Sequence, residues 1–136
     1  MRVVIDTNVL VSALWSRNNR LAQIIELFIS GAVVPCYCAE IMREYQDVLS
    51  RPKLAFRLAG ADVSEIIERI KAGGMCVVVR PSSEPFADES DRVFFDVAKA
   101  CEAILITGNK KHYPIEPFVM SPAEFLDSIE EGGQSV

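Results

Sequence analysis

Two polar residues of the sequence follow apolar runs that are typical of β-strands, and both are candidates for chemistry. Asp6 comes directly after the run RVVI, and Asn109 comes directly after ILITG. In open parallel sheets, ligands bind beyond the carboxyl ends of the strands, so both side chains are expected at one rim of a sheet. Each residue taken alone also fits a turn, because DTN and TGN are good turn sequences.

Two acidic residues of predicted helices extend this set. Asp91 lies three residues before Phe94, so it shares the apolar stripe of its helix. Glu44 lies three residues after Ile41 and four before Val48, on the margin of another apolar stripe. A carboxylate on the apolar side of a helix must be paired, protonated or bound to a metal ion.

A metal ion is the explanation that accounts for all three acids together. Asp6, Glu44 and Asp91 at one rim would repel one another without a cation, and oxygen ligands suit Mg²⁺ or Mn²⁺. Taken singly, Glu44 fits a surface acid, and Asp88 and Asp91 fit caps of a helix N-terminus. The sequence therefore predicts a metal site, with caps and turns as the alternative.

The elements that would position these residues alternate along the chain. The apolar strand runs are continuous, which is typical of a parallel sheet covered on both faces. We expect a three-layer α/β/α domain of four to five strands over residues 1–130 and a frayed tail at 131–136. The strands are expected at 1–5, 32–37, 75–79, 103–107 and 118–120, and the helices at 21–29, 41–49, 62–71, 94–101 and 122–129.

Two local patterns refine this expectation. Pro35 lacks a backbone N–H, which favours an edge or irregular position for the second strand. Asp96 is spaced to pair with Arg92 and Lys99, which predicts a solvated face of its helix.

Composition and charge narrow the classes of function. The chain has 136 residues, half of them apolar, and a formal net charge of −5. A disordered chain is excluded, and so is a protein that holds duplex DNA by charge alone. An acidic chain can still act on a phosphodiester if metal ions supply the positive charge.

The cysteines point to a cytoplasmic protein. Cys36, Cys38, Cys76 and Cys101 lack CxxC spacing, so we expect them to be reduced and buried. The lone His112 provides no second ligand pair for a zinc site. No apolar stretch approaches the roughly 20 residues of a membrane span, and the first ten residues fit a strand better than a secretion signal.

Four motifs in order resemble the PIN domain, most closely the VapC-like toxins of toxin–antitoxin systems. They are VIDTNVLVSAL at 4–14, EYQDVLSRPK at 44–53, DESDRVFFDVAKA at 88–100 and ILITGNKKHYP at 104–114. The segment VMSPAEFL also matches the closing strand and helix of that family.

The resemblance assigns catalytic and metal-binding roles. The family's first three acids fall on Asp6, Glu44 and Asp91. Its fourth acidic position holds Asn109, a neutral oxygen donor, which is a departure that makes a second metal ion doubtful. Asp88, three residues before Asp91, is a candidate to compensate as a metal ligand.

The resemblance also implies an activity and its partners. PIN domains of this type are similar to Mg²⁺- or Mn²⁺-dependent endoribonucleases, in which a metal-activated water attacks the phosphorus and leaves a 5′-phosphate and a 3′-hydroxyl. The implied partners are an RNA substrate, an antitoxin and a second copy of the chain. The candidates for RNA binding are Thr7, Asn8, Arg17, Arg43 and Lys110.

Two other functions remain open from the sequence. A non-catalytic PIN-like module that binds RNA or protein would agree with Asn109 at the fourth acidic position. A metal-dependent phosphatase or phosphotransferase is disfavoured, because DTN lacks the second Asp of a DxDxT pattern and no GxxxxGK[ST] loop occurs.

Overall fold

The computed structural model describes residues 1–15, 19–54 and 60–134 and contains one five-stranded parallel sheet. The strand order is β3-β2-β1-β4-β5, and every pair of neighbours is parallel. The predicted fold class is therefore confirmed. The strands are β1 (Arg2–Ile5), β2 (Val34–Tyr37), β3 (Met75–Cys76), β4 (Ile104–Ile106) and β5 (Val119–Met120).

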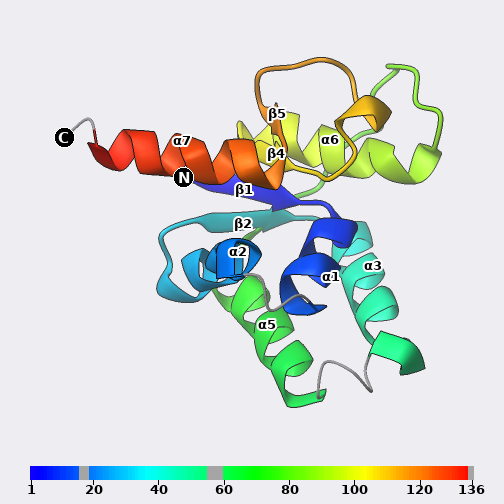
Figure 1. Cartoon of the computed structure of the whole chain (residues 1–136). Coiled ribbons are helices and arrows are strands. Elements are labelled where there is room, and N and C mark those ends of the chain that lie inside the picture. The colour runs from blue at the N-terminus through cyan, green and yellow to red at the C-terminus, as the bar shows by residue number, and fades with distance from the viewer. Residues whose placement is uncertain (16–18, 55–59, 135–136) are drawn as a thin grey trace.

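Helices cover both faces of the sheet because the direction of strand addition reverses once. The connections from β1 to β2 and from β2 to β3 run one way across the sheet, and the connection from β3 to β4 runs back. Right-handed crossovers then place the helix before β4 on the opposite face from the helices before β2 and β3, as Figure 1 shows. The helices are α1 (Thr7–Trp15), α2 (Asn19–Ser30), α3 (Ala39–Leu49), α5 (Gly60–Gly73), α6 (Glu89–Cys101) and α7 (Pro122–Gln134), and a short 3₁₀ helix, η1, spans Lys110–His112.

The core lies on both sides of the central strands. Val3, Val4 and Ile5 of β1 are almost fully buried. On one face α6 packs across β1, β2 and β4 and buries Phe94 and Phe95. On the other face α3 and α5 contact β2, whereas α7 packs beside β5 and against α2. No helix in the described ranges is both long and apolar enough to cross a membrane.

The position of β2 corrects the prediction made from Pro35. β2 lies between β1 and β3, not at an edge. The missing N–H is tolerated because β3 begins only at Met75, which pairs with Cys36, so the ladder on that side starts one residue later. The carbonyl oxygen of Pro35 instead faces Gly74, where an added Cβ would lie 2.6 Å from it.

Other element boundaries also differ from the prediction. α1 begins directly after Asp6, where a turn was expected, because Val9, Leu10 and Ala13 are buried against the core. β3 has two residues instead of five, and Cys76 on this edge strand is exposed, contrary to the expected burial. α7 continues to Gln134, so residues 131–134 of the expected tail are helical.

Candidate active site

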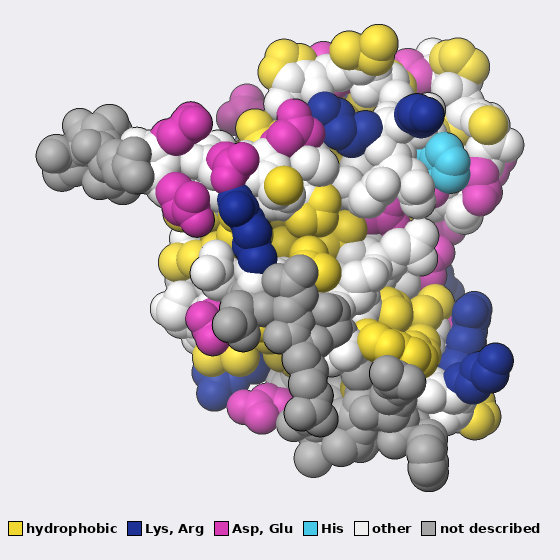
Figure 2. Space-filling model, in the orientation of Figure 1, with side chains coloured by type: hydrophobic (Ala, Val, Ile, Leu, Met, Phe, Trp, Pro, Cys, Tyr) yellow, Lys and Arg dark blue, Asp and Glu magenta, His cyan; other side chains and the backbone are white. Residues whose placement is uncertain are grey.

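The point where strand addition reverses lies between β1 and β4, and an acidic pocket is found there. The pocket has a volume of about 250 Å³ and lies at the carboxyl ends of these two strands, as expected for open α/β sheets. Figure 2 shows acidic side chains gathered around the histidine on this side of the molecule. The pocket is lined by Asp6, Thr7, Asn8, Glu44, Val48, Arg51, Asp88, Ser90, Asp91, Phe94, Asn109 and His112.

Asp6 is fixed in this pocket by neutral donors. Its side chain is buried, and its Oδ2 accepts hydrogen bonds from Thr107 Oγ1 at 2.8 Å and from the Tyr113 hydroxyl at 3.2 Å. Its backbone N–H donates to the carbonyl of Ile106 at 2.9 Å, which ties the end of β1 to β4. Both side-chain bonds use the same oxygen, so the carboxylate is oriented while its charge is kept.

The Tyr113 hydroxyl is a donor at any physiological pH. Burial raises the pKa of this phenol, and the nearby carboxylates of Asp6 and Asp91 raise it further. Thr107 is fixed in its turn, because its Oγ1 accepts the backbone N–H of Asn109 at 3.0 Å. The orientation of Asp6 therefore depends on a small hydrogen-bonded network at the end of β4.

Glu44 reaches the pocket from α3. Its Oε2 accepts a hydrogen bond from the Thr7 hydroxyl at the start of α1. The next residue, Tyr45, is buried and donates to the carbonyl of Ile5. These contacts join α3 to the end of β1 and keep Glu44 beside Asp6.

The environment of Asp91 disfavours the negative charge of its carboxylate. Its side chain is 16% exposed, and its Oδ2 is buried with no hydrogen-bond partner among the described residues. Burial raises the pKa of this carboxyl, and the negative charges of Asp6, Asp88 and Glu44 raise it further, whereas His112 acts in the opposite direction. His112 Nδ1 lies 3.6 Å from Oδ2, too far for a hydrogen bond.

The donor set fits a hard divalent cation such as Mg²⁺. Among the described residues, no three His, Cys, Asp or Glu side chains form a ready-made shell around one point. Mg²⁺ commonly binds one or two carboxylates directly and keeps several waters, so it does not need such a shell. The orphaned oxygen of Asp91, beside Asp6 and Glu44, fits this kind of site.

Asp88 and Asn109 line the pocket in positions that also have structural roles. Asp88 is the N-cap of α6, where its Oδ1 accepts from the Ser90 N–H at 3.0 Å and from the Ser90 hydroxyl at 2.8 Å. These hydrogen bonds lower the pKa of Asp88. Asn109 is exposed at the rim, and its N–H is bound by Thr107. Metal binding by either residue stays a prediction.

The structure separates the predicted RNA-binding residues. Thr7 and Asn8 line the acidic pocket. Arg43 is exposed on α3 but does not line it, and Arg17 lies outside the described residues. Lys110 lines a different cavity and pairs with Glu124 of α7 at 2.9 Å, because η1 turns its side chain toward that helix.

Three side chains at or near the pocket were not predicted from the sequence to belong to this site. Thr107 and Tyr113 orient Asp6, and His112 borders Asp91. All three lie within the motif ILITGNKKHYP, so the motif located the region, but nothing in its spacing indicates which residues point inward. Their contacts depend on the path of the chain after β4.

The structure is a three-layer α/β/α fold with an acidic pocket at the point where the direction of strand addition reverses. This combination defines the class of protein. A family model described as PIN domain matches residues 2–111. The chain therefore belongs to the PIN domain family, and the predicted resemblance is confirmed.

A curated relative aligns with nearly the whole chain. The chain is 30% identical to the uncharacterized protein MJ1680 of Methanocaldococcus jannaschii over 146 aligned residues, which cover 96% of this chain and 93% of the relative. No solved structure matches the chain.

Proposed function

We propose that this PIN domain protein is a metal-dependent endoribonuclease and the toxin component of a toxin–antitoxin pair in the cytoplasm. The observation that carries the nuclease is the buried Oδ2 of Asp91, which lies beside Asp6 and Glu44 and has no hydrogen-bond partner within the described structure. Leaving such an acceptor unsatisfied costs roughly 1–3 kcal/mol, so the site is explained best by an ion that completes it.

The residues of the pocket would have different roles in the hydrolysis of a phosphodiester. A bound Mg²⁺ or Mn²⁺ would supply a water of lowered pKa and would polarise a phosphoryl oxygen. Asp6, Glu44 and Asp91 would hold the ion, and Asn109 would add a neutral oxygen. Thr107 keeps Asp6 in a fixed orientation through the hydrogen bond at Oδ2.

Positive charge for the RNA backbone is available at the rim of the pocket. Arg51 lines it directly. The Arg51 side chain is 61% exposed and shares a 3.5 Å ion pair with Asp47, a contact that a phosphate can replace at low cost. With a net charge of −5, the chain would depend on the metal ion to attract RNA.

The proposal is tested with the purified chain and an end-labelled single-stranded RNA. Cleavage is expected with Mg²⁺ or Mn²⁺, none with EDTA, and none by Asp6→Asn in either ion, and the products should carry 5′-phosphates. Arg69→Lys, on an exposed pair with Glu65 of α5, serves as the control that should cleave like the parent. Cleavage that persists in EDTA or in Asp6→Asn would remove the metal-dependent mechanism.

The toxin role has its own test. Induced expression of the parent chain is expected to stop the growth of a bacterial host, and Asp6→Asn is expected not to do so. Growth arrest by both proteins would separate toxicity from the pocket.

A second function is favoured by Asn109. An exposed amide at the fourth acidic position agrees with a PIN-like module that binds RNA or protein without cleaving it. In that case the parent and Asp6→Asn would bind RNA equally and neither would cleave it.

We expect a homodimer under either function, and light scattering at tens of micromolar checks this oligomeric state.

A further inference from the structure

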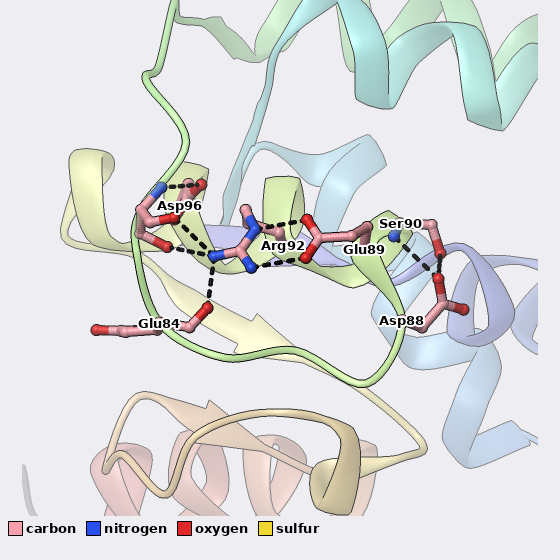
Figure 3. A network of polar contacts seen from close by, with 7 residues as sticks. Glu84, Asp88, Glu89, Ser90, Arg92 and Asp96 are labelled. Atoms are coloured by element: carbon pink, nitrogen blue, oxygen red, sulfur yellow. Dashed lines mark hydrogen bonds and ion pairs between the residues drawn. The ribbon is translucent and has the colours of Figure 1, made fainter.

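An irregular segment between β3 and α6 is held in place by one arginine. We call residues 77–88 the strap, because they form neither helix nor strand and lie along α6. Arg92 Nη1 donates to the carbonyl oxygens of Ser82 at 2.7 Å and Glu84 at 2.6 Å. Asp96, four residues along α6, accepts the Ser82 N–H at 3.0 Å. Figure 3 shows these contacts, which anchor the middle of the strap to the helix.

The shape of the guanidinium matters for this anchor. While Nη1 binds the strap, Nε and Nη2 of Arg92 each donate to Glu89 at 2.8 Å, so the side chain is gripped from both sides. Its Cζ lies 4.8 Å from the centre of the Phe86 ring, in cation–π contact. The side chain is only 14% exposed. A lysine would keep the charge but lacks the planar fork of five donors that serves these partners together.

The strap is connected to the acidic pocket in two ways, directly through Asp88 and indirectly through Tyr113. Its last residue, Asp88, caps α6 and lines the pocket. Phe86 packs edge-on against Tyr113, with ring centres 6.1 Å apart, and the Tyr113 hydroxyl donates to Asp6 Oδ2. The place of Arg92 is different, because it lines a separate cavity with Glu40, Val79 and Pro81 and not the acidic pocket.

We propose that Arg92 is a positioning residue of the acidic pocket, which acts through the strap. It fixes Phe86 against Tyr113, and Tyr113 orients Asp6. It also fixes the end of the strap, and with it the Asp88 cap at the start of the helix that carries Asp91. This inference rests on the proposed metal-dependent function, because the geometry it protects is that of the metal-binding carboxylates.

The sequence assigned Arg92 and Asp96 to a solvated face, and the structure corrects that assignment. Asp96 is buried, at 7% exposure, because the backbone of the strap covers it. Val77 at the start of the strap still donates its N–H to the carbonyl of Tyr37, but further along the strap α6 side chains satisfy the backbone groups of Ser82 and Glu84. These contacts hold the irregular strap in one conformation next to the acidic pocket.

The test is Mn²⁺ titration by calorimetry on the full chain, for the parent, Arg92→Lys, Arg92→Met and Phe86→Leu. Supporting residues around metal ligands change affinity by roughly 10–100-fold. We expect Arg92→Lys and Phe86→Leu to weaken Mn²⁺ binding about tenfold, at the lower end, because they act indirectly. If Arg92→Met does not fold, these two milder variants carry the test. Arg69→Lys is the matched control and should bind Mn²⁺ like the parent.

Two further measurements separate positioning from general stability. Hydrogen exchange of the strap amides should be faster in Arg92→Lys, while exchange in β1 and β4 stays unchanged. In RNA cleavage, the Mn²⁺ concentration for half-maximal rate should rise, and kcat at saturating Mn²⁺ should return toward the parent value. A loss of stability alone would not produce this split.

The possible results distinguish the inference from the proposed function. Unchanged Mn²⁺ affinity in all three strap variants, with binding abolished in Asp6→Asn, would overturn the role of Arg92 and leave the metal site standing. A parent chain that binds no Mn²⁺ would overturn both. Weakened binding in Arg92→Lys and Phe86→Leu, with Arg69→Lys unchanged, would support the positioning role.

Discussion

Asp91→Asn is expected to make the metal-free protein more stable while removing its response to metal. The substitution keeps the shape of the side chain and removes its charge. In the parent, Asp91 Oδ2 is buried and has no hydrogen-bond partner in the described structure, and Asp6, Asp88 and Glu44 add like charge around it. An amide in this place can donate to one of those carboxylates.

The size of the effect follows from the orphaned oxygen. A buried unsatisfied acceptor costs roughly 1–3 kcal/mol, and the amide recovers part of that, so we expect a gain of about 1–2 kcal/mol. For a chain of this length that corresponds to about 3–6 °C in Tm, measured by calorimetry in EDTA at pH 7.

The pH dependence of the gain has a definite sign. Because burial and nearby carboxylates raise the pKa of Asp91 in the folded protein, its ionised form is disfavoured there. The destabilisation is present above the raised pKa and is relieved as pH falls toward the ordinary value of about 4. The advantage of Asp91→Asn should therefore be greatest at neutral pH and should disappear near pH 4.

Mn²⁺ should reverse the order of stability of the parent and Asp91→Asn. At a Mn²⁺ concentration of about 100 times Kd, the parent gains roughly 2.7 kcal/mol, and Asp91→Asn should gain little. Arg69→Lys is the control, because its exposed pair with Glu65 on α5 involves no residue of the pocket or the strap. It should melt like the parent in EDTA and respond to Mn²⁺ as the parent does. The reasoning is refuted if Asp91→Asn melts below the parent in EDTA at pH 7, or if Mn²⁺ stabilises the parent and Asp91→Asn equally.

Three other substitutions probe the site and the sheet. Tyr113→Phe removes one of the two donors to Asp6, so Mn²⁺ affinity should fall by calorimetry, and stability should fall by about 1 kcal/mol in urea unfolding. Asn109→Asp should strengthen Mn²⁺ binding and lower Tm in EDTA, because it adds a carboxylate to an acidic pocket; identical values for both would place Asn109 outside the site. Gly74→Ala should cost about 2–4 kcal/mol, because its Cβ would meet two backbone carbonyl oxygens at 2.4 and 2.6 Å, whereas Gly73→Ala, with no atom within 4 Å, is the control expected to unfold like the parent.

The layers of the fold were predictable because they depend on local patterns. Continuous apolar runs separated by amphipathic helices determine a covered parallel sheet, and β1, β2, β4 and β5 lie where those runs predicted them. Asp6 and Asn109 were predicted because they follow strands whose carboxyl ends meet at one rim of the sheet, whereas Glu44 and Asp91 were predicted from their positions on or beside the apolar stripes of helices. Asp6, Glu44, Asp91 and Asn109 accordingly line one pocket.

The parts that could not be predicted depend on contacts between distant segments. Asp96 has the spacing of a solvated acid, but its partner is the backbone of Ser82, which no helical periodicity reveals. Tyr113 is 107 residues from Asp6 in sequence, and only the path of the chain after η1 joins them. Lys110 was expected near RNA for its charge, and its ion pair with Glu124 depends on where α7 packs.

The donors around the pocket orient its carboxylates without balancing their charge, which agrees with the proposed metal site. The side-chain donors to Glu44 and Asp6 are hydroxyls: Thr7 donates to Glu44, and Thr107 and Tyr113 donate to Asp6. A hydroxyl orients a carboxylate without cancelling its charge, whereas a lysine or arginine in the same place would neutralise it and occupy the position of a metal. The guanidinium of Arg92 instead donates hydrogen bonds to the strap and to Glu89, outside the pocket. The charges of the acidic cluster therefore repel one another, and under the proposed function a divalent ion would remove that electrostatic cost on binding.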